Sequence, residues 1–191
     1  MAPETSPISS TCSKKFDVFL SFRGEDTRKQ FTDHLYSSLN QKGIYTFRDD
    51  KELERGKPIS PELLKAVEES RFAVVILSKD YASSSWCLEE LSKIVECNKV
   101  KGQIIIPVFY HVEPTEVRKQ TGNYGEAFAK HQQVFKDDAE KVKRWREALF
   151  EVASISGWDV KGRYVIPLLF SFSPFLLFIY IFPLHLGDLN T

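Results

Sequence analysis

The sequence has few of the residues from which disulfide-bonded or zinc-built domains are made. Its 191 residues include three cysteines, at positions 12, 87 and 97, which form no Cys-x-x-Cys pair and no Cys/His zinc pattern. A disulfide framework and a structural zinc site are therefore not expected, and reduced thiols in a cytoplasmic protein are the simplest interpretation. The four histidines are scattered and have no nearby metal-ligand partner, so no metal site is predicted.

Neither sign of charge is in excess, and the known phosphate-binding loops are missing. Lys+Arg and Asp+Glu both number 26, so the net charge is zero and a basic nucleic-acid-binding surface is not expected. No G-x-G-x-x-G follows the first predicted strand. The run Arg55-Gly56-Lys57-Pro58 lacks the upstream glycine and the final hydroxyl of a G-x-x-x-x-G-K-[ST] loop.

The two ends of the chain differ in composition from its middle. Residues 1–13 are small and polar and lack the apolar core of a signal peptide, so we expect a disordered leader. Residues 165–184 carry no charge over 20 positions, which is long enough for a membrane-spanning helix. Lys161 and Arg163 precede this run and would leave the main domain in the cytoplasm. The alternative is that residues 164–191 are a non-native tail without function, and both interpretations stay open.

The middle of the chain, residues 14–163, alternates between short apolar runs and amphipathic stretches, which predict strands and helices. Strands buried on both faces favour a parallel sheet with helices on both sides. At this length we expect an α/β fold with a flavodoxin-like open sheet of four to five strands in the order 2-1-3-4-5. Pro107 favours a position near the edge for the fourth strand, and a fifth strand is not obvious. The predicted strands are 16–21, 44–47, 72–77 and 104–109, and the last predicted helix is 141–156.

Several residues mark where the predicted helices begin. Ser60, followed by Pro61, has the pattern of a helix N-terminus, and so do the serines at positions 83–85. Thr27 and Gln30 have the spacing of a capping box, which predicts that the first helix begins near Thr27.

Residues from two loops are expected to meet at one end of this sheet. In open α/β sheets a ligand binds beyond the carboxyl ends of the strands, where the winding direction reverses, which here falls between the first and third strands. The first loop carries Phe22, Arg23 and Gly24, and the helix after the third strand carries Trp86 and Glu90 on one face. Aromatic rings, an arginine and a carboxylate in one place suit a ligand that has a base, phosphate and ribose.

The same residues have a structural interpretation. Phe22 and Trp86 would plug the end of the core, Arg23 would pair with Glu25 or Asp26, and Glu90 would be a solvated helix residue. Composition and spacing alone favour this interpretation, because ligand sites are few per protein.

Longer motifs resemble a known family. The run Phe16 to Arg28 resembles the opening of a plant TIR (Toll/interleukin-1 receptor) domain, and the resemblance extends over about residues 14–159. The chain resembles the N-terminal domain of TIR-type nucleotide-binding, leucine-rich-repeat immune receptors, here as a TIR-only or truncated product. The other motifs that carry it are Phe47–Asp50 with Leu53–Gly56, Ser70–Ser78, Tyr81–Leu91, Pro107–Tyr110 and Val117–Gly122.

The resemblance implies a flavodoxin-type fold and a reaction. The implied activity is cleavage of NAD+ to nicotinamide and ADP-ribose or its cyclic variants, which serve as immune signals. NAD+ is then a substrate, and no cofactor is expected. The catalytic glutamate of the family corresponds to Glu90. Its substrate contacts correspond to Phe22, Arg23, Gly24 and Trp86, with Arg55 as a further contact.

The resemblance also implies that activity requires association with other TIR domains. Self-association in the family uses the first and last helices, and His34 matches a histidine of the first-helix contact. Asp33 precedes it, where many members carry serine. The alternative function is a TIR–TIR interaction module without catalysis, acting as an adaptor or decoy in defence signalling.

Overall fold

The computed structural model describes residues 14–49 and 60–160. The predicted leader, Arg55 and the apolar run 165–184 lie outside these residues. Among the described residues, no helix has both the length and the apolar character that crossing a bilayer requires.

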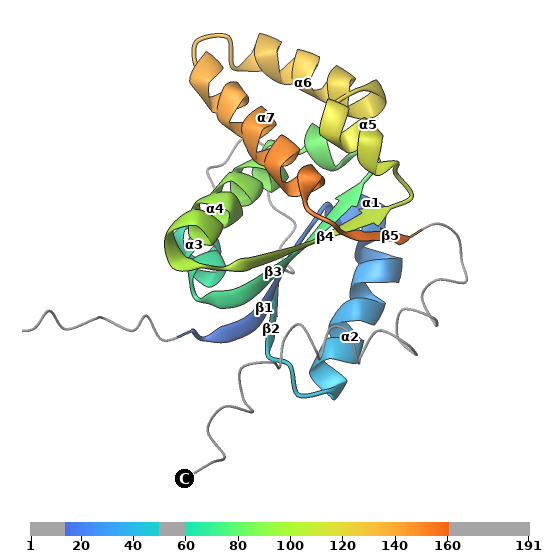
Figure 1. Cartoon of the computed structure of the whole chain (residues 1–191), viewed down its shortest axis with the longest axis vertical. Coiled ribbons are helices and arrows are strands. Elements are labelled where there is room, and N and C mark those ends of the chain that lie inside the picture. Colours follow the sequence, from blue (N-terminus) through green and yellow to red (C-terminus); the bar gives the residue numbers. More distant parts are fainter. Residues whose placement is uncertain (1–13, 50–59, 161–191) are drawn as a thin grey trace, which may run out of the picture.

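The core of the fold is a parallel sheet of five strands in the order β2-β1-β3-β4-β5, which confirms the predicted topology (Figure 1). The short fifth strand supplies one edge, so β4 lies one position inside it, near the edge as its proline predicts. The strands are β1 (Phe16–Phe22), β2 (Thr46–Arg48), β3 (Ser70–Ser78), β4 (Ile104–Tyr110) and β5 (Trp158–Val160).

Helices cover both faces of the sheet, and each face has its own hydrophobic core (Figure 1). One core packs α2 against one face, and the larger core joins the opposite face to α3, α4, α5, α6 and α7. The helical elements are α1 (Gly24–Thr27), the π-helix η1 (Arg28–Thr32), α2 (Asp33–Gln41), α3 (Pro61–Glu68), the 3-10 turn η2 (Tyr81–Ser83), α4 (Ser85–Lys101), α5 (Pro114–Lys119), α6 (Gly122–Val134) and α7 (Ala139–Ser154).

Two of the three predicted helix starts are confirmed. The Ser60 hydroxyl accepts from Leu63 N, and the Ser84 hydroxyl accepts from Cys87 N at 3.3 Å. The capping box at Thr27 is wrong, because helical structure already begins at Gly24. The Thr27 hydroxyl is buried and bonds the Thr32 hydroxyl at 2.8 Å, so it serves the core rather than the helix end.

The fifth strand is too short for a sequence signal, and it depends on a close approach. β5 has three residues and follows Gly157, where a Cβ would lie 2.5 Å from the Pro107 carbonyl oxygen of β4. Glycine is therefore required at this point for the chain to reach the edge of the sheet.

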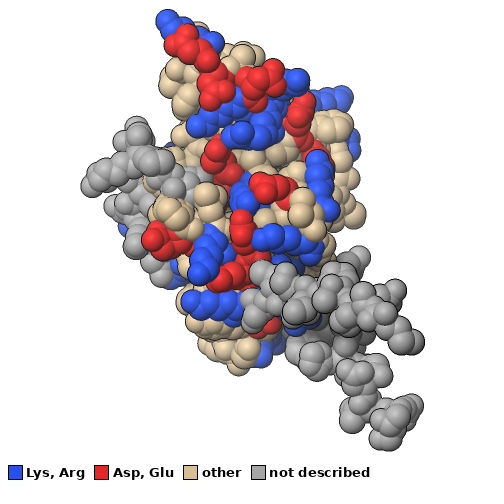
Figure 2. All heavy atoms as spheres, turned by 90° about the vertical axis from the view of Figure 1, so that its left-hand side faces the viewer, with Lys and Arg blue, Asp and Glu red and all other residues tan. Residues whose placement is uncertain are grey.

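Charges of both signs intermix on the surface over α3, α4 and α7 (Figure 2). Ion pairs link the elements there: Glu68 pairs with Lys93 and Lys101, and Lys99 pairs with Glu151. This face presents no one-signed field of the kind that binds nucleic acid.

Candidate functional site

The loops after β1 and β3 lie in contact at the carboxyl end of the sheet. The two strands pair in parallel, with Phe22 opposite Ile76. Beyond them, one carboxylate oxygen of Asp26 accepts hydrogen bonds from the Ser78 hydroxyl at 2.5 Å and from Asp80 N at 3.3 Å. The topology therefore brings together the two segments that the sequence predicted to meet.

Glu90 is buried at this junction rather than solvated. It lies in the second turn of α4 and is 7 % exposed. The Ser21 hydroxyl of β1 donates to Glu90 Oε2 at 3.0 Å. The neighbouring Glu89 points to the surface instead, where its carboxylate accepts from Arg144 at 2.9 Å and from Trp145 Nε1 at 2.5 Å. The two adjacent glutamates thus have separate environments, and Glu90 alone reaches the carboxyl end of β1.

Burial changes the proton affinity of this carboxyl. Loss of solvation raises the pKa of Glu90 from 4.5 to about 8. The hydrogen bond from Ser21 acts in the opposite direction, and the nearby charge of Asp49 adds to the rise. Glu90 therefore holds its proton at neutral pH in the free protein, unless a cation enters beside it.

Two buried hydroxyls extend the environment of Glu90 away from solvent. The Ser21 hydroxyl lies 2.9 Å from the Tyr81 hydroxyl, which donates to the Cys87 carbonyl oxygen at 3.1 Å. Both side chains are fully buried. The sequence analysis did not single out either residue. The available signal was a serine among the apolar residues at the end of β1, together with a tyrosine three residues after the end of β3.

Phe22, at the end of β1, and Arg23, directly after it, are placed as the structural interpretation predicted. Phe22 is buried in the core beside α2, with the Arg28 guanidinium 5.2 Å from its ring centre. Arg23 forms ion pairs with Glu25 and Asp26. At Gly24, a Cβ would lie 3.0 Å from the Arg28 side chain. The phenylalanine thus closes the core, while the arginine holds its carboxylate partners close to the junction.

The remaining predicted residues are placed as follows. Trp86 is half-buried in the first turn of α4, one helical turn before Glu90. His34 is exposed on α2, whereas Asp33 pairs with Arg48 at the end of β2. Arg55 lies outside the described residues. The structure therefore brings Glu90, Phe22 and Arg23 to one end of the sheet and leaves His34 on the surface.

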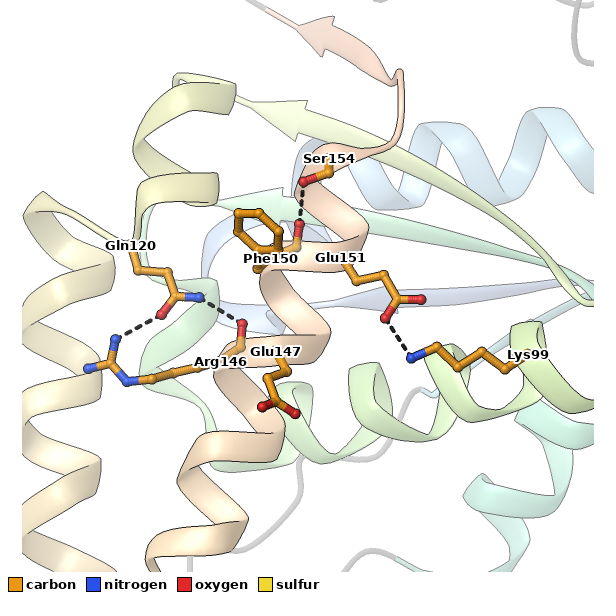
Figure 3. A pocket seen from close by; sticks show the side chains of 7 residues that line it. All are labelled: Lys99, Gln120, Arg146, Glu147, Phe150, Glu151 and Ser154. Carbon is orange, nitrogen blue, oxygen red and sulfur yellow. Dashed lines mark hydrogen bonds and ion pairs between the residues drawn. The ribbon is translucent and has the colours of Figure 1, made fainter.

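A hollow elsewhere on the surface has different chemistry. It measures about 640 Å³ and is lined by residues of α7, the end of α4 and Gln120 after α5, several of whose polar groups are paired to one another (Figure 3). The Arg146 guanidinium donates to the Gln120 side chain at 2.8 Å, and Lys99 pairs with Glu151 at 2.7 Å. Lys99 lies nine residues along α4 from Glu90, a rise of about 14 Å. The hollow is thus separate from the Glu90 junction.

The arrangement at Glu90 supports carboxylate chemistry. No three His, Cys, Asp or Glu side chains among residues 14–49 and 60–160 lie together as metal ligands would. A buried carboxyl near an ion-paired arginine can stabilise a cation that develops in a bound substrate.

Fold and site together define a class of protein: a flavodoxin-like α/β domain with a buried glutamate where the loops after β1 and β3 meet. The chain belongs to the TIR family, because residues 15–164 match the TIR domain.

Plant proteins are among the relatives. The chain is 60% identical over 145 residues to the disease resistance protein RPV1 of Vitis rotundifolia, which covers 76% of this chain and 10% of that protein. It is 55% identical over 149 residues to the TMV resistance protein N of Nicotiana glutinosa, covering 78% of this chain and 13% of that protein. The chain therefore spans about a tenth of the length of these curated relatives.

A solved structure agrees with the family. The TIR domains of the activated Roq1 resistosome, which directly recognises the pathogen effector XopQ, superpose on this chain with a TM-score of 0.74 at 56% identity. The match covers 82% of this chain and 98% of that one.

Proposed function

We propose that this chain is an NAD+ nucleosidase, of the hydrolase or ADP-ribosyl cyclase type, that acts in plant immune signalling after self-association. The observation that carries the proposal is the buried Glu90 carboxyl at the carboxyl end of β1. Two further findings support it. The TIR family includes NAD+-cleaving enzymes, and the relatives at 55% and 60% identity are named as resistance proteins.

The chemistry requires one carboxylate at the reacting carbon. The bond between C1′ of the ribose and the nicotinamide nitrogen breaks, and its electron pair leaves with nicotinamide, which departs neutral. C1′ becomes oxocarbenium-like, and an adjacent carboxylate stabilises that charge or adds to it, as in glycoside hydrolysis. Water then adds at C1′ and releases a proton, so the products are nicotinamide, ADP-ribose and H+. No second acid is needed, which fits Glu90 as the one carboxyl that is buried among residues 14–49 and 60–160.

The protonation state of Glu90 follows from the charge of the substrate. In the free protein burial keeps the pKa of Glu90 near 8, so the carboxyl is mostly neutral at pH 7. The nicotinamide ring of NAD+ carries a positive charge, and an opposite charge close to a carboxyl lowers its pKa. Binding of NAD+ would therefore release the proton of Glu90 and create the carboxylate beside the bond that breaks.

The other predicted residues have roles in binding NAD+. Arg23 would meet the phosphates after exchanging its exposed partner Glu25 for them, while Asp26 stays bonded to Ser78. Gly24 would let backbone approach the ligand. Trp86 would contact a ring or the ribose. Phe22 and Arg55 remain proposed substrate contacts.

The proposal includes association with other TIR domains. The similar Roq1 structure is that of an activated resistosome, and exposed His34 on α2 is available to a second TIR domain. Association would hold TIR domains close together, which raises the local concentration of the segments that form one composite site. A cytoplasmic location and a membrane attachment through residues 165–184 remain predictions.

Paired substitutions at the two adjacent glutamates test the enzyme proposal. Glu90→Gln in the full chain should abolish NAD+ loss, because the amide cannot stabilise a cation as a carboxylate does. Glu89→Gln, which removes a surface carboxylate, should keep most of the activity. Nicotinamide release is measured at high protein concentration, with circular dichroism as the folding control. Equal turnover by parent and Glu90→Gln would remove Glu90 from the reaction.

The alternative function is a TIR–TIR interaction module without catalysis. The observation in its favour is the ion pairing of Arg23 with Glu25 and Asp26, which occupies the group that would meet phosphate. If the parent chain associates with TIR domains but releases no nicotinamide at any concentration, this alternative is the correct one.

A further inference from the structure

We propose that Ser21 and Tyr81 are positioning residues for Glu90, and that their hydroxyls form a hydrogen-bond chain whose direction reverses when Glu90 gains or loses its proton. This inference rests on the proposed function of Glu90. The hydrogen-bond chain runs from Glu90 Oε2 through Ser21 Oγ at 3.0 Å and Tyr81 OH at 2.9 Å to the Cys87 carbonyl oxygen at 3.1 Å.

Two proton arrangements keep the hydrogen bonds from Glu90 to Ser21 and from Ser21 to Tyr81 continuous. Each hydroxyl has one proton to donate. When Glu90 is protonated, it donates to Ser21, Ser21 donates to Tyr81, and Tyr81 donates to the Cys87 carbonyl, so three hydrogen bonds form. When Glu90 is ionised, Tyr81 donates to Ser21 and Ser21 donates to the carboxylate. The Cys87 carbonyl then accepts only the main-chain hydrogen bond of the α-helix.

The surroundings prevent other groups from replacing these partners. Ser21 and Tyr81 are 0 % exposed, so no bulk water reaches them. The hydrogen-bond chain joins three separate elements, β1, η2 and the first turn of α4. It therefore fixes where the Glu90 carboxyl lies relative to the loop after β1. Desolvation also keeps the Tyr81 phenol and the Cys87 thiol neutral by raising the pKa of each well above its usual range.

Other charged groups close to this cluster bear on any pH effect. Asp49, after β2, contributes a negative charge that raises the pKa of Glu90. Arg23 and Asp26, after β1, act on the Cys87 thiol with opposite signs. Tyr124 of α6 acts on Tyr81. The substitutions at Ser21 and Tyr81 remove none of these groups, so the two hydroxyls can be tested separately.

Removal of the Ser21 hydroxyl and removal of the Tyr81 hydroxyl should shift the pKa of Glu90 in opposite directions. Ser21→Ala takes away the donor to the carboxylate, so the pKa of Glu90 should rise by about one unit. Tyr81→Phe leaves Ser21 free to donate to the carboxylate but removes the acceptor that the neutral arrangement needs. The pKa of Glu90 should then fall. A purely structural role predicts a fall in both variants, because loosened packing admits water and restores solvation of the charge.

The test is a carbon-13 NMR titration of the full-length protein, with glutamate labelled at the side-chain carboxyl. The Glu90 signal is identified by its absence in Glu90→Gln. The expected results are a higher midpoint in Ser21→Ala, a lower one in Tyr81→Phe, and a midpoint near that of the parent in Ser21→Thr, which keeps the hydroxyl. An unchanged or lowered midpoint in a folded Ser21→Ala overturns the inference. A raised midpoint in Tyr81→Phe would show that Tyr81 does not belong to the hydrogen-bond chain.

A kinetic arm separates this inference from the proposed function. If Glu90 is the catalytic carboxylate, the acid limb of the pH profile of kcat/KM for NAD+ cleavage follows the NMR midpoint, because kcat/KM reports the ionisation of the free enzyme. Ser21→Ala then loses about tenfold in kcat/KM at pH 7 and recovers activity near pH 9. A parent that cleaves no NAD+ refutes the proposed function, while the titration still decides on the hydroxyl chain. Normal cleavage by the parent with no shift in Ser21→Ala refutes the hydroxyl chain alone.

Discussion

At the scale of single residues, the adjacent pair Glu89 and Glu90 shows how position along one helix separates two identical side chains. Consecutive helical residues point about 100° apart, so one carboxyl turns toward β1 and the other toward α7. Glu89 accepts hydrogen bonds from Arg144 and from buried Trp145 of α7, and Glu90 accepts one from Ser21 of β1. The chemical difference between them is therefore one of solvation, and loss of solvation raises the proton affinity of Glu90.

Burial of Glu90 should make the protein less stable as pH rises. The pKa of this group is about 8 in the folded chain and 4.5 when unperturbed. Between these values the unfolded chain has lost the proton that the folded chain keeps, so stability falls from about pH 4.5 to pH 8. Glu90→Gln stays neutral at every pH. Its free energy of unfolding should therefore exceed that of the parent by a margin that grows with pH to a few kcal/mol, because one pKa unit corresponds to about 1.4 kcal/mol.

Urea unfolding of parent and Glu90→Gln at pH 5 and pH 9 measures this effect. The difference between the two proteins cancels the titration of all other groups that the substitution leaves unchanged. Glu89→Gln, the same substitution at the adjacent residue of α4, is measured under the same conditions for comparison. An equal difference at both pH values would mean that Glu90 titrates normally in the folded chain.

At the scale of elements, α4 presents the candidate site, and its first turn depends on one cap. The Ser84 hydroxyl accepts from Cys87 N at the start of the helix that carries Trp86 and Glu90. The same turn supplies the Cys87 carbonyl at the end of the hydroxyl chain. A weaker cap therefore loosens the position of the site as well as the helix.

Ser84→Ala should destabilise the protein by about 1 kcal/mol, the usual effect of losing a serine cap. For a protein of this size that is a fall in Tm of roughly 2–4 °C. Ser83→Ala is the control, because Ser83 is exposed in η2 and does not cap the helix. Thermal unfolding followed by circular dichroism measures both. Equal midpoints for the two variants would show that the Ser84 hydroxyl contributes nothing to the helix.

At the scale of the whole molecule, the exposed face of α2 bears on association. Asp33 and His34 are neighbours, but Asp33 is paired with Arg48 of β2, whereas His34 is exposed. Asp33 thus joins α2 to the strand beside it, and His34 is the one of the two that a second TIR domain would contact. The net charge of zero adds no long-range repulsion between copies.

His34→Ala should weaken self-association and raise the protein concentration needed for half-maximal specific activity by about threefold to tenfold, equivalent to roughly 1 kcal/mol. Asn40→Ala is the matched control, because Asn40 is also exposed on α2 but points in another direction around the helix. The measurement is nicotinamide release over a concentration series, with sedimentation velocity for the size of the assemblies. Overlapping curves for parent and His34→Ala would place the contact elsewhere.

The sequence correctly predicted the order of the strands, the helix starts at Ser60 and Ser84, and the meeting of the loops after β1 and β3. Apolar runs, caps and the rules for parallel sheets are local or topological signals. The start of the first helix did not follow, because Thr27 is paired with Thr32 in the core. β5 did not follow either, since its three residues pair with β4 only through the close approach at Gly157.

The sequence by itself determined which residue types stand at the carboxyl ends of the strands, including the spacing of Trp86 and Glu90. Only the tertiary structure decided which of the two adjacent carboxyls is desolvated, and that its partner is Ser21, which in turn contacts the Tyr81 hydroxyl. Spacing along a chain reports the direction in which a side chain leaves its helix. Solvation and hydrogen bonding depend on the strand and turn packed against that helix, which are 69 and 9 residues away from Glu90 in the sequence.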